Sequence, residues 1–229
     1  MMIITITGTN TDVGKTISTA ALAAALSAAG NDITVAKPIQ TGAPVGERDI
    51  DVIEKLSGIS GHQLAAFPEP LAPNLSARRA GMTPPDLGEV VAWIRKLDAP
   101  GRIVLVEGAG GLLVRLAESY TLADVAAALG SPVIVVTSTG LGSLNLAELT
   151  VREAQRSGLD VAALIGGSLP ATIDLATQLN LAEFPKVTGV DLWGTIPAGA
   201  GEMDGERFRE AAVGWLPAAL APVQLRGFL

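Results

Sequence analysis

The chain has 229 residues, of which 48% are hydrophobic and only 3% aromatic, so we expect a core of aliphatic side chains. It contains no cysteine, which excludes disulfides and thiolate chemistry. The formal charge of −7 argues against a broad surface for nucleic acid or acidic membranes. His62 is the single histidine, which argues against a histidine triad or a multi-histidine zinc site, and we expect it on the surface or in a loop.

The N-terminus has no basic region before its first apolar run, so no secretory signal is expected and we predict a cytoplasmic protein. The uncharged run 125–147 is long enough to suggest a membrane span. It contains Gly130, Pro132, Gly140 and Gly142, however, and its apolar centre "VIVV" is typical of a buried strand. We therefore expect no membrane span.

Short β-branched runs are predicted to form strands buried on both faces, which is typical of a parallel sheet. These strands cover residues 2–7, 33–36, 103–106, 133–136 and 161–165. Helices are predicted over residues 16–29, 49–56, 87–97, 122–129, 144–156 and about 206–216. This alternation predicts one α/β domain over residues 1–229, with a mostly parallel central sheet, helices on both faces and ligands at the carboxyl ends of the strands. The proline-rich segment 67–85 is expected to be an ordered excursion or a lid.

The stretch "TGTNTDVGKT", residues 7–16, comes within one glycine of a phosphate-binding loop. The strict pattern G-x-x-x-x-G-K-[ST] needs glycine where this chain has Thr9, and Gly8 stands one place earlier. A predicted strand precedes the loop and an alanine-rich helix follows it. The helix N-terminus, the Lys15 ammonium and the Thr16 hydroxyl therefore predict a site for nucleotide phosphates and Mg²⁺. The alternative is a glycine-containing turn with a surface Lys-Thr pair.

Three acidic residues are candidates for a site near the phosphates. Glu107 closes the run "IVLV" and precedes "GAGG", where a carboxylate suits a metal ion; alternatively it caps a loop. Asp49 begins a predicted helix and fits a metal ligand and a helix N-cap equally well. Asp124 lies in Thr121-Leu-Ala-Asp124, a capping box, so we expect it to be structural.

Lys37 ends the second predicted strand, in "AKPIQTG", and should therefore point to the same sheet edge as Lys15. A lysine there can neutralise charge that grows on a transferred phosphoryl group, with Thr41 as a nearby hydrogen-bonding group. The alternative is a strand-end lysine whose ammonium reaches solvent. Arg78 and Arg79, in the proline-rich segment, are expected to be solvated.

Taken together, these motifs resemble the dethiobiotin synthetase family. The matching pieces are "GTNTDVGKT", "KPIQTG", the helix that Asp49 begins, "VEGAGGLLV", "TLADVA", "VIVVTSTGLGSLN" and "GTIPAG", in the family's order from residue 3 to about residue 200. The family's own loop is G-T-x-T-x-V-G-K-T, which accounts for the displaced glycine. The resemblance implies a P-loop NTPase fold.

The resemblance also implies a Mg²⁺-dependent ligase of biotin synthesis. Its substrates would be 7,8-diaminononanoate, CO₂ and a nucleoside triphosphate. One amine becomes a carbamate, the γ-phosphoryl group is transferred to it, and the second amine closes the ureido ring of dethiobiotin and releases phosphate. A homodimer is implied as well.

Residue roles follow from the same resemblance, motif by motif. Thr16, Asp49 and Glu107 would hold Mg²⁺, while Lys15 and Lys37 would stabilise the transferred phosphoryl group.

Substrate contacts are implied in the same way. Thr11 would donate to the carbamate or the phosphate, and Thr41 would contact the diamine. Leu144 and Asn145, at a helix N-terminus suited to a carboxylate, would reach into the neighbouring subunit's site. The nucleotide and its metal would be bound by Asp12, Val13, Gly14, Lys15, Thr16, Ile17, Asp49, Glu107, Gly108, Ala109, Gly110, Gly167, Ser168, Pro197, Ala198 and Gly199.

The base site departs from part of the family. Many members carry an Asn-Asp pair whose asparagine reads adenine, but "LIGGSLP" places Gly167 and Ser168 there. Backbone groups of Gly167 and of residues 197–199 are expected to face the base instead. Because an open glycine-lined site discriminates poorly, we expect CTP to be accepted as well as or better than ATP. The alternative is that other contacts favour ATP.

Three other classes of protein share some of these sequence features. A partition- or positioning-type P-loop ATPase shares the fold, but its loop carries a signature lysine and a glycine pair where this chain has Asn10, Thr11 and Asp12. A cobyrinate-type amide ligase normally carries a glutaminase domain with a catalytic cysteine, and this chain has no cysteine. A non-enzymatic nucleotide-binding module would not need Lys37 and Thr41. Whether nucleotide turnover requires the diamine discriminates between these classes.

Overall fold

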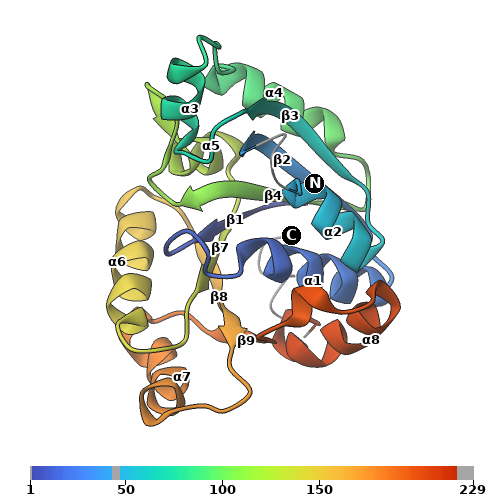
Figure 1. The fold of residues 1–229 in the computed structure, drawn as a ribbon, viewed down its shortest axis with the longest axis vertical. Helices are drawn as coiled ribbons and strands as arrows, with labels where there is room; N and C mark the ends of the chain where they lie inside the picture. Colours follow the sequence, from blue (N-terminus) through green and yellow to red (C-terminus); the bar gives the residue numbers. More distant parts are fainter. Residues whose placement is uncertain (1, 43–46, 221–229) are drawn as a thin grey trace.

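A seven-stranded sheet lies at the centre of the computed structural model, which describes residues 2–42 and 47–220 (Figure 1). The strand order is β3-β2-β4-β1-β7-β8-β9, and neighbouring strands pair in parallel. The strands are β1 (Met2–Gly8), β2 (Asp32–Thr41), β3 (Gly61–Phe67), β4 (Arg102–Gly111), β7 (Val133–Thr137), β8 (Val161–Leu169) and β9 (Leu192–Pro197). A separate antiparallel pair consists of β5 (Arg115–Ala117) and β6 (Tyr120–Thr121). The predicted domain 1–229 includes residues 1, 43–46 and 221–229, which lie outside the described residues.

Helices cover both faces of this sheet (Figure 1). One face carries α1 (Lys15–Ala28), α2 (Asp49–Ser57) and α8 (Gly205–Trp215), which pack on one another. The other face carries α4 (Leu87–Leu97), α5 (Leu122–Leu129), α6 (Ser143–Arg156) and α7 (Leu175–Thr188). The remaining helices are α3 (Pro73–Arg79) and two 3₁₀ turns, η1 (Ala200–Glu202) and η2 (Pro217–Leu220). This doubly covered parallel sheet confirms the predicted fold class.

The core is aliphatic, as the composition predicts. In α1 every residue from Ser18 to Leu26 is buried, because its alanine side chains are small enough for the helix to lie between the sheet, α2 and α8. Burying each leucine, isoleucine or valine contributes about 1.5–3 kcal/mol to stability. The tight seating of α1 fixes the loop that precedes it, and the loop is where the chemistry is expected.

The predicted strands and helices are all present, with ends that shift by a few residues. The sequence patterns did not predict six further elements: β3, β5, β6, β9, α3 and α7. The two missed strands of the central sheet occupy its edges, where glycine and polar residues interrupt the apolar run, as in "GHQLAAF" and "LWGTIP". His62 is exposed on edge strand β3 and does not lie in a loop. Segment 67–85 contains α3.

Two strands extend further than predicted, which corrects the positions of Lys37 and Glu107. The pairing of β2 with β4 ends at Ala36 and Val106. Beyond it, β2 continues along β3 as far as Thr41, and β4 continues along β1. Lys37 and Glu107 therefore lie within their strands, at the point where β2 and β4 separate, because each strand still has a partner on its other side.

None of the helices in residues 2–42 and 47–220 is long and apolar enough to cross a membrane. The uncharged run 125–147 is divided among α5, strand β7 and α6.

Candidate functional site

The phosphate loop connects β1 to α1 through a tight reversal. Asp12 and Gly14 have left-handed backbone angles, with φ of 59° and 87°. An added Cβ at Gly8 would lie 2.7 Å from the Asn10 carbonyl oxygen, so the fold of the loop itself requires glycine at this displaced position. Lys15 then begins α1, whose first N–H groups have no partner within the helix and form an anion site.

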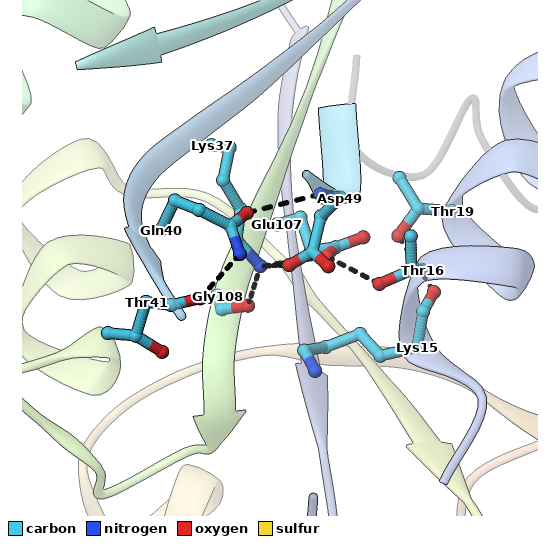
Figure 2. Close-up of polar contacts among 9 residues, drawn as sticks. All are labelled: Lys15, Thr16, Thr19, Lys37, Gln40, Thr41, Asp49, Glu107 and Gly108. Atoms are coloured by element: carbon cyan, nitrogen blue, oxygen red, sulfur yellow. Dashed lines mark hydrogen bonds and ion pairs between the residues drawn. The ribbon is translucent and has the colours of Figure 1, made fainter. Parts of the chain in front are cut away.

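A buried charged cluster lies beside this loop (Figure 2). The Lys37 side chain is only 2% exposed, and its ammonium forms an ion pair with Asp49. It also donates hydrogen bonds of 2.9 Å to Glu107 Oε1 and 2.9 Å to the Gly108 carbonyl oxygen. The Thr16 hydroxyl donates to the same Glu107 oxygen at 3.0 Å. All three ammonium donors of Lys37 are therefore used by residues of β4 and α2.

Mutual charge sets the protonation states of the cluster. Burial by itself would lower the pKa of Lys37, but Glu107 and Asp49 outweigh it, so the pKa lies above its ordinary value. Burial would raise the pKa of Glu107, but Lys37 and Lys15 hold it below the usual range. The pKa of Lys15 is lowered by burial, with a further contribution from Lys37. At neutral pH, Lys37 is thus a fixed cation and Glu107 a fixed anion.

The residues proposed for Mg²⁺ come together and fit that ion. Glu107 is fully buried, yet its Oε2 has no hydrogen-bond partner among the described residues. Asp49 is the first residue of α2 and directs its carboxylate to Lys37, and Arg48 occupies the N-cap, so the N-cap alternative for Asp49 is wrong. Within the described ranges, no group of three or more acidic or histidine side chains holds a metal unaided. Two carboxylates and the Thr16 hydroxyl suit Mg²⁺, which takes its remaining ligands from water and phosphates.

The loop and the cluster open into one cavity of about 460 Å³. The cavity is lined by Thr11, Asp12, Gly14, Lys15, Thr16, Ile17, Lys37, Gln40, Thr41, Asp49, Ala109 and Gly110. An adjoining cavity of about 300 Å³ shares Thr11, Thr41, Ala109 and Gly110 and is completed by residues 70–73 and Val114. The structure therefore brings both predicted lysines and both predicted substrate threonines to one continuous space.

The predicted base-facing segments lie at the ends of β8 and β9, outside the lining of that cavity. Gly167 is buried directly against the phosphate loop: an added Cβ there would lie 2.0 Å from the Val13 carbonyl oxygen. An added Cβ at Gly14 would lie 2.1 Å from the Gly167 carbonyl oxygen. Ser168 and residues 197–199 are exposed. Close backbone packing thus requires glycine at both positions.

Leu144 and Asn145 are not part of the cavity within one chain. Both lie in the first turn of α6, where Leu144 packs against the core and Asn145 is exposed. Neither lines the space that holds Thr11 and Thr41.

Several structural expectations are confirmed. Asp124 forms a capping box with Thr121 at the start of α5. Arg78 and Arg79 are exposed and pair with surface acids. Gln40, which the sequence analysis did not select, also lines the main cavity. Its only signal in the sequence is a polar residue between Ile39 and Thr41 in "KPIQTG".

A buried β-strand followed by a phosphate loop, with Lys15 and Thr16 opening the next helix, defines a P-loop nucleotide-binding protein. A family profile described as "AAA domain" matches residues 3–201. The septum site-determining protein MinD of Pyrococcus horikoshii, solved in complex with Mg-ADP, superimposes with a TM-score of 0.61 at 16% identity. That likeness covers 99% of this chain and 98% of the other, and at this identity it concerns the fold alone.

Curated relatives define the family more narrowly. The ATP-dependent dethiobiotin synthetase BioD of Corynebacterium diphtheriae is 60% identical over 208 residues, which cover 91% of this chain and 94% of the relative. The protein of the same name from Streptomyces avermitilis is 50% identical over 219 residues, covering 94% and 92%. The chain belongs to the ATP-dependent dethiobiotin synthetase family.

Proposed function

We propose that this chain, as a single domain over residues 1–229, converts 7,8-diaminononanoate, CO₂ and a nucleoside triphosphate into dethiobiotin, nucleoside diphosphate and phosphate. It is accordingly a ligase that forms C–N bonds in biotin biosynthesis. The observation that carries the proposal is that Lys15, Thr16, Lys37 and Asp49 line one cavity beside the phosphate loop, where Thr16 and Lys37 also bind the buried Glu107. A cytoplasmic location is part of the same proposal.

The nucleotide phosphates bind at the start of α1. The first N–H groups of that helix and the Lys15 ammonium attract them, and the low pKa of Lys15 rises again once the phosphates supply negative charge. Thr16, Asp49 and Glu107 would hold Mg²⁺. Bound there, the ion would neutralise charge on the β- and γ-phosphates.

Lys37 is assigned to the transferring phosphoryl group. Its ammonium is buried, stays protonated and already binds Glu107, Asp49 and the Gly108 carbonyl, so it would stabilise the phosphoryl oxygens through its positive charge and not by giving up a proton. The carbamate oxygen attacks the γ-phosphorus and the nucleoside diphosphate leaves. The second amine then attacks the carbamoyl carbon, and phosphate leaves as the ring closes. Thr11 and Thr41, which both line the cavity, would hydrogen-bond to the carbamate and the diamine.

A homodimer is part of this proposal. Leu144 and Asn145 do not line the cavity of their own chain. Residues that serve the site of a neighbouring subunit are expected to lie in such a position. Large apolar side chains are exposed on or near the same helix: Leu149 lies in α6, Leu141 precedes it, and Leu113 lines a cavity together with Leu149. Leu141 is 92% exposed. Exposed apolar side chains of this size favour association with another protein surface.

The proposal is tested with purified protein supplied with diaminononanoate, bicarbonate, Mg²⁺ and ATP or CTP. We expect dethiobiotin to form in equal amount to the nucleoside diphosphate. Nucleotide hydrolysis that proceeds at the same rate without the diamine, and yields no dethiobiotin, would instead identify a positioning-type ATPase switch.

A further inference from the structure

The side chain of Gln40 links the end of β2 to the beginning of α2 (Figure 2). Gln40 is only 7% exposed. Its amide oxygen accepts a hydrogen bond of 3.2 Å from the Asp49 backbone N–H. Its amide nitrogen donates one of 2.8 Å to the Thr41 carbonyl oxygen. Both ends of the amide are therefore used, in one defined orientation.

The link matters because α2 has no ordinary cap. The N–H groups of the first helical turn need acceptors from outside the helix, and a side chain at the N-cap usually supplies one. In the part of the chain that the structure describes, the side chain of the N-cap residue Arg48 makes no capping bond, and its guanidinium instead binds the Asp51 carboxylate at 2.7 and 2.6 Å. Gln40 thus supplies an acceptor to the first residue of α2 from the neighbouring strand.

Asp49 is consequently held at two points by one strand. Its backbone N–H is fixed by Gln40 and its carboxylate by Lys37, and both partners belong to β2. The carboxylate is partly exposed, unlike that of Glu107, so packing constrains it less. A metal ligand of this kind depends on hydrogen bonds that fix its backbone, and loss of such support typically weakens metal binding.

We propose that Gln40 is a positioning residue for Asp49: its amide fixes the start of α2 against β2 and so places the Asp49 carboxylate for Mg²⁺. This role rests on the proposed function, in which Asp49 is a metal ligand. Only a side chain with a donor and an acceptor at the right reach can bind the Thr41 carbonyl and the Asp49 N–H together. Asparagine is one methylene too short, and methionine has the length but no amide.

The test compares Gln40→Met and Gln40→Asn with wild type by calorimetric titration of Mg²⁺ in the presence of a non-hydrolysable ATP analogue. We expect the dissociation constant for Mg²⁺ to rise about tenfold in both variants. The Asp49 amide proton, measured by NMR hydrogen exchange, should lose protection. Gln40→Asn remains polar, so it keeps the test available if Gln40→Met fails to fold.

A second substitution separates positioning from simple helix capping. Arg48→Ser in the Gln40→Met background places an ordinary N-cap residue on α2, while the Gln40 bond to the Asp49 N–H stays absent and only the Lys37 ion pair still joins β2 to Asp49. We expect it to restore thermal stability but not Mg²⁺ affinity. Recovery of wild-type Mg²⁺ affinity by Arg48→Ser, or unchanged affinity in both Gln40 variants, would overturn the proposal.

Asn31→Ala is the matched control. This substitution removes the hydrogen bond of 2.9 Å that the Asn31 side-chain amide donates to the Leu26 carbonyl oxygen. Asn31 directly precedes β2, at the opposite end of the strand from the cavity. We expect wild-type Mg²⁺ affinity, and a loss equal to that of the Gln40 variants would contradict a local role. Wild-type protein is assayed in parallel for dethiobiotin, so a failure of the proposed function is seen there and is distinct from a failure of the Gln40 proposal.

Discussion

The Lys37 ammonium and the Glu107 carboxylate lie 2.9 Å apart at the point where β2 and β4 separate. Both side chains are buried, and each lies within its strand. Burying two charges is costly unless they are well paired and hydrogen-bonded, and here Thr16, Asp49 and the Gly108 carbonyl complete the pairing. Removing either partner would leave the other as an uncompensated buried charge, so the stability of the chain as well as its proposed chemistry depends on keeping the two together.

Replacing Lys37 by methionine should impair both roles. We expect kcat to fall by about 10²–10³-fold, with little change in the KM for nucleotide, because the ammonium acts on the charge of the transition state. Thermal stability should fall too, since Glu107 loses its partner. Steady-state kinetics and a melting curve measure the two effects. Adding Glu107→Gln should recover stability but not activity; near-normal kcat in Lys37→Met would show that the catalytic role is wrong.

Lys15→Ala should have a different kinetic signature. Lys15 begins α1 and lines the cavity beside the phosphate loop, so we expect it to contact the phosphates before and during the reaction. We expect the dissociation constant for the nucleotide to rise and kcat to fall together. Equilibrium binding of a non-hydrolysable ATP analogue checks the first part. Unchanged nucleotide affinity in a folded variant would exclude a phosphate contact.

Much of this site could be predicted from the sequence, because the carboxyl ends of parallel strands meet at one sheet edge. That rule brings Lys37, Glu107 and the phosphate loop together. The same rule does not predict at which residue β2 and β4 end. Each of them continues beside its other neighbour, β3 or β1, and the sequence does not show which residues pair there. The role of Gln40 could not be predicted from its neighbours in the sequence, because its bond to Asp49 joins residues nine positions apart that follow no helical or strand periodicity.

The roles of Asp49, Leu144 and Asn145 also depend on contacts that a sequence pattern does not contain. Asp49 fits both a cap and a ligand by position, and only its contact with Lys37 decides between them. The role proposed for Leu144 and Asn145 depends on a second chain, which no feature of one chain's periodicity encodes.

Asp49→Asn should weaken Mg²⁺ binding, because a neutral amide replaces one of the two proposed acidic ligands. Asp124→Asn is the control: it alters a capping box on α5 and should cost at most about 1 kcal/mol of stability while activity remains normal. Titration of activity against Mg²⁺ concentration, together with a denaturation curve, measures both variants. An Asp124→Asn protein that folds normally yet is inactive would contradict this division of roles.

The lowered pKa of Glu107 predicts a loss of stability in acid. A carboxyl whose pKa is depressed on folding stabilises the folded state above its unfolded pKa, near the ordinary value of 4.5, and this stabilisation disappears as pH falls through the folded pKa. Melting temperatures should therefore drop more steeply below that ordinary value in wild type than in Glu107→Gln. Parallel curves for the two proteins would show that the buried pair does not contribute to acid denaturation.

Base selectivity should be weak, and the reason lies in the contact between Gly167 and the phosphate loop. A side chain at Gly167 would place its Cβ 2.0 Å from the Val13 carbonyl oxygen, so this chain cannot carry an adenine-reading asparagine there without moving the loop. Backbone groups discriminate less than a side-chain amide that is left unpaired by the wrong base. We expect CTP to be used as well as or better than ATP in a comparison of kcat/KM for ATP, CTP, GTP and UTP. Gly167→Asn should lower activity with all four by displacing the loop, without creating a preference for ATP. A preference for ATP of about a hundredfold in wild type would show that other contacts read the base.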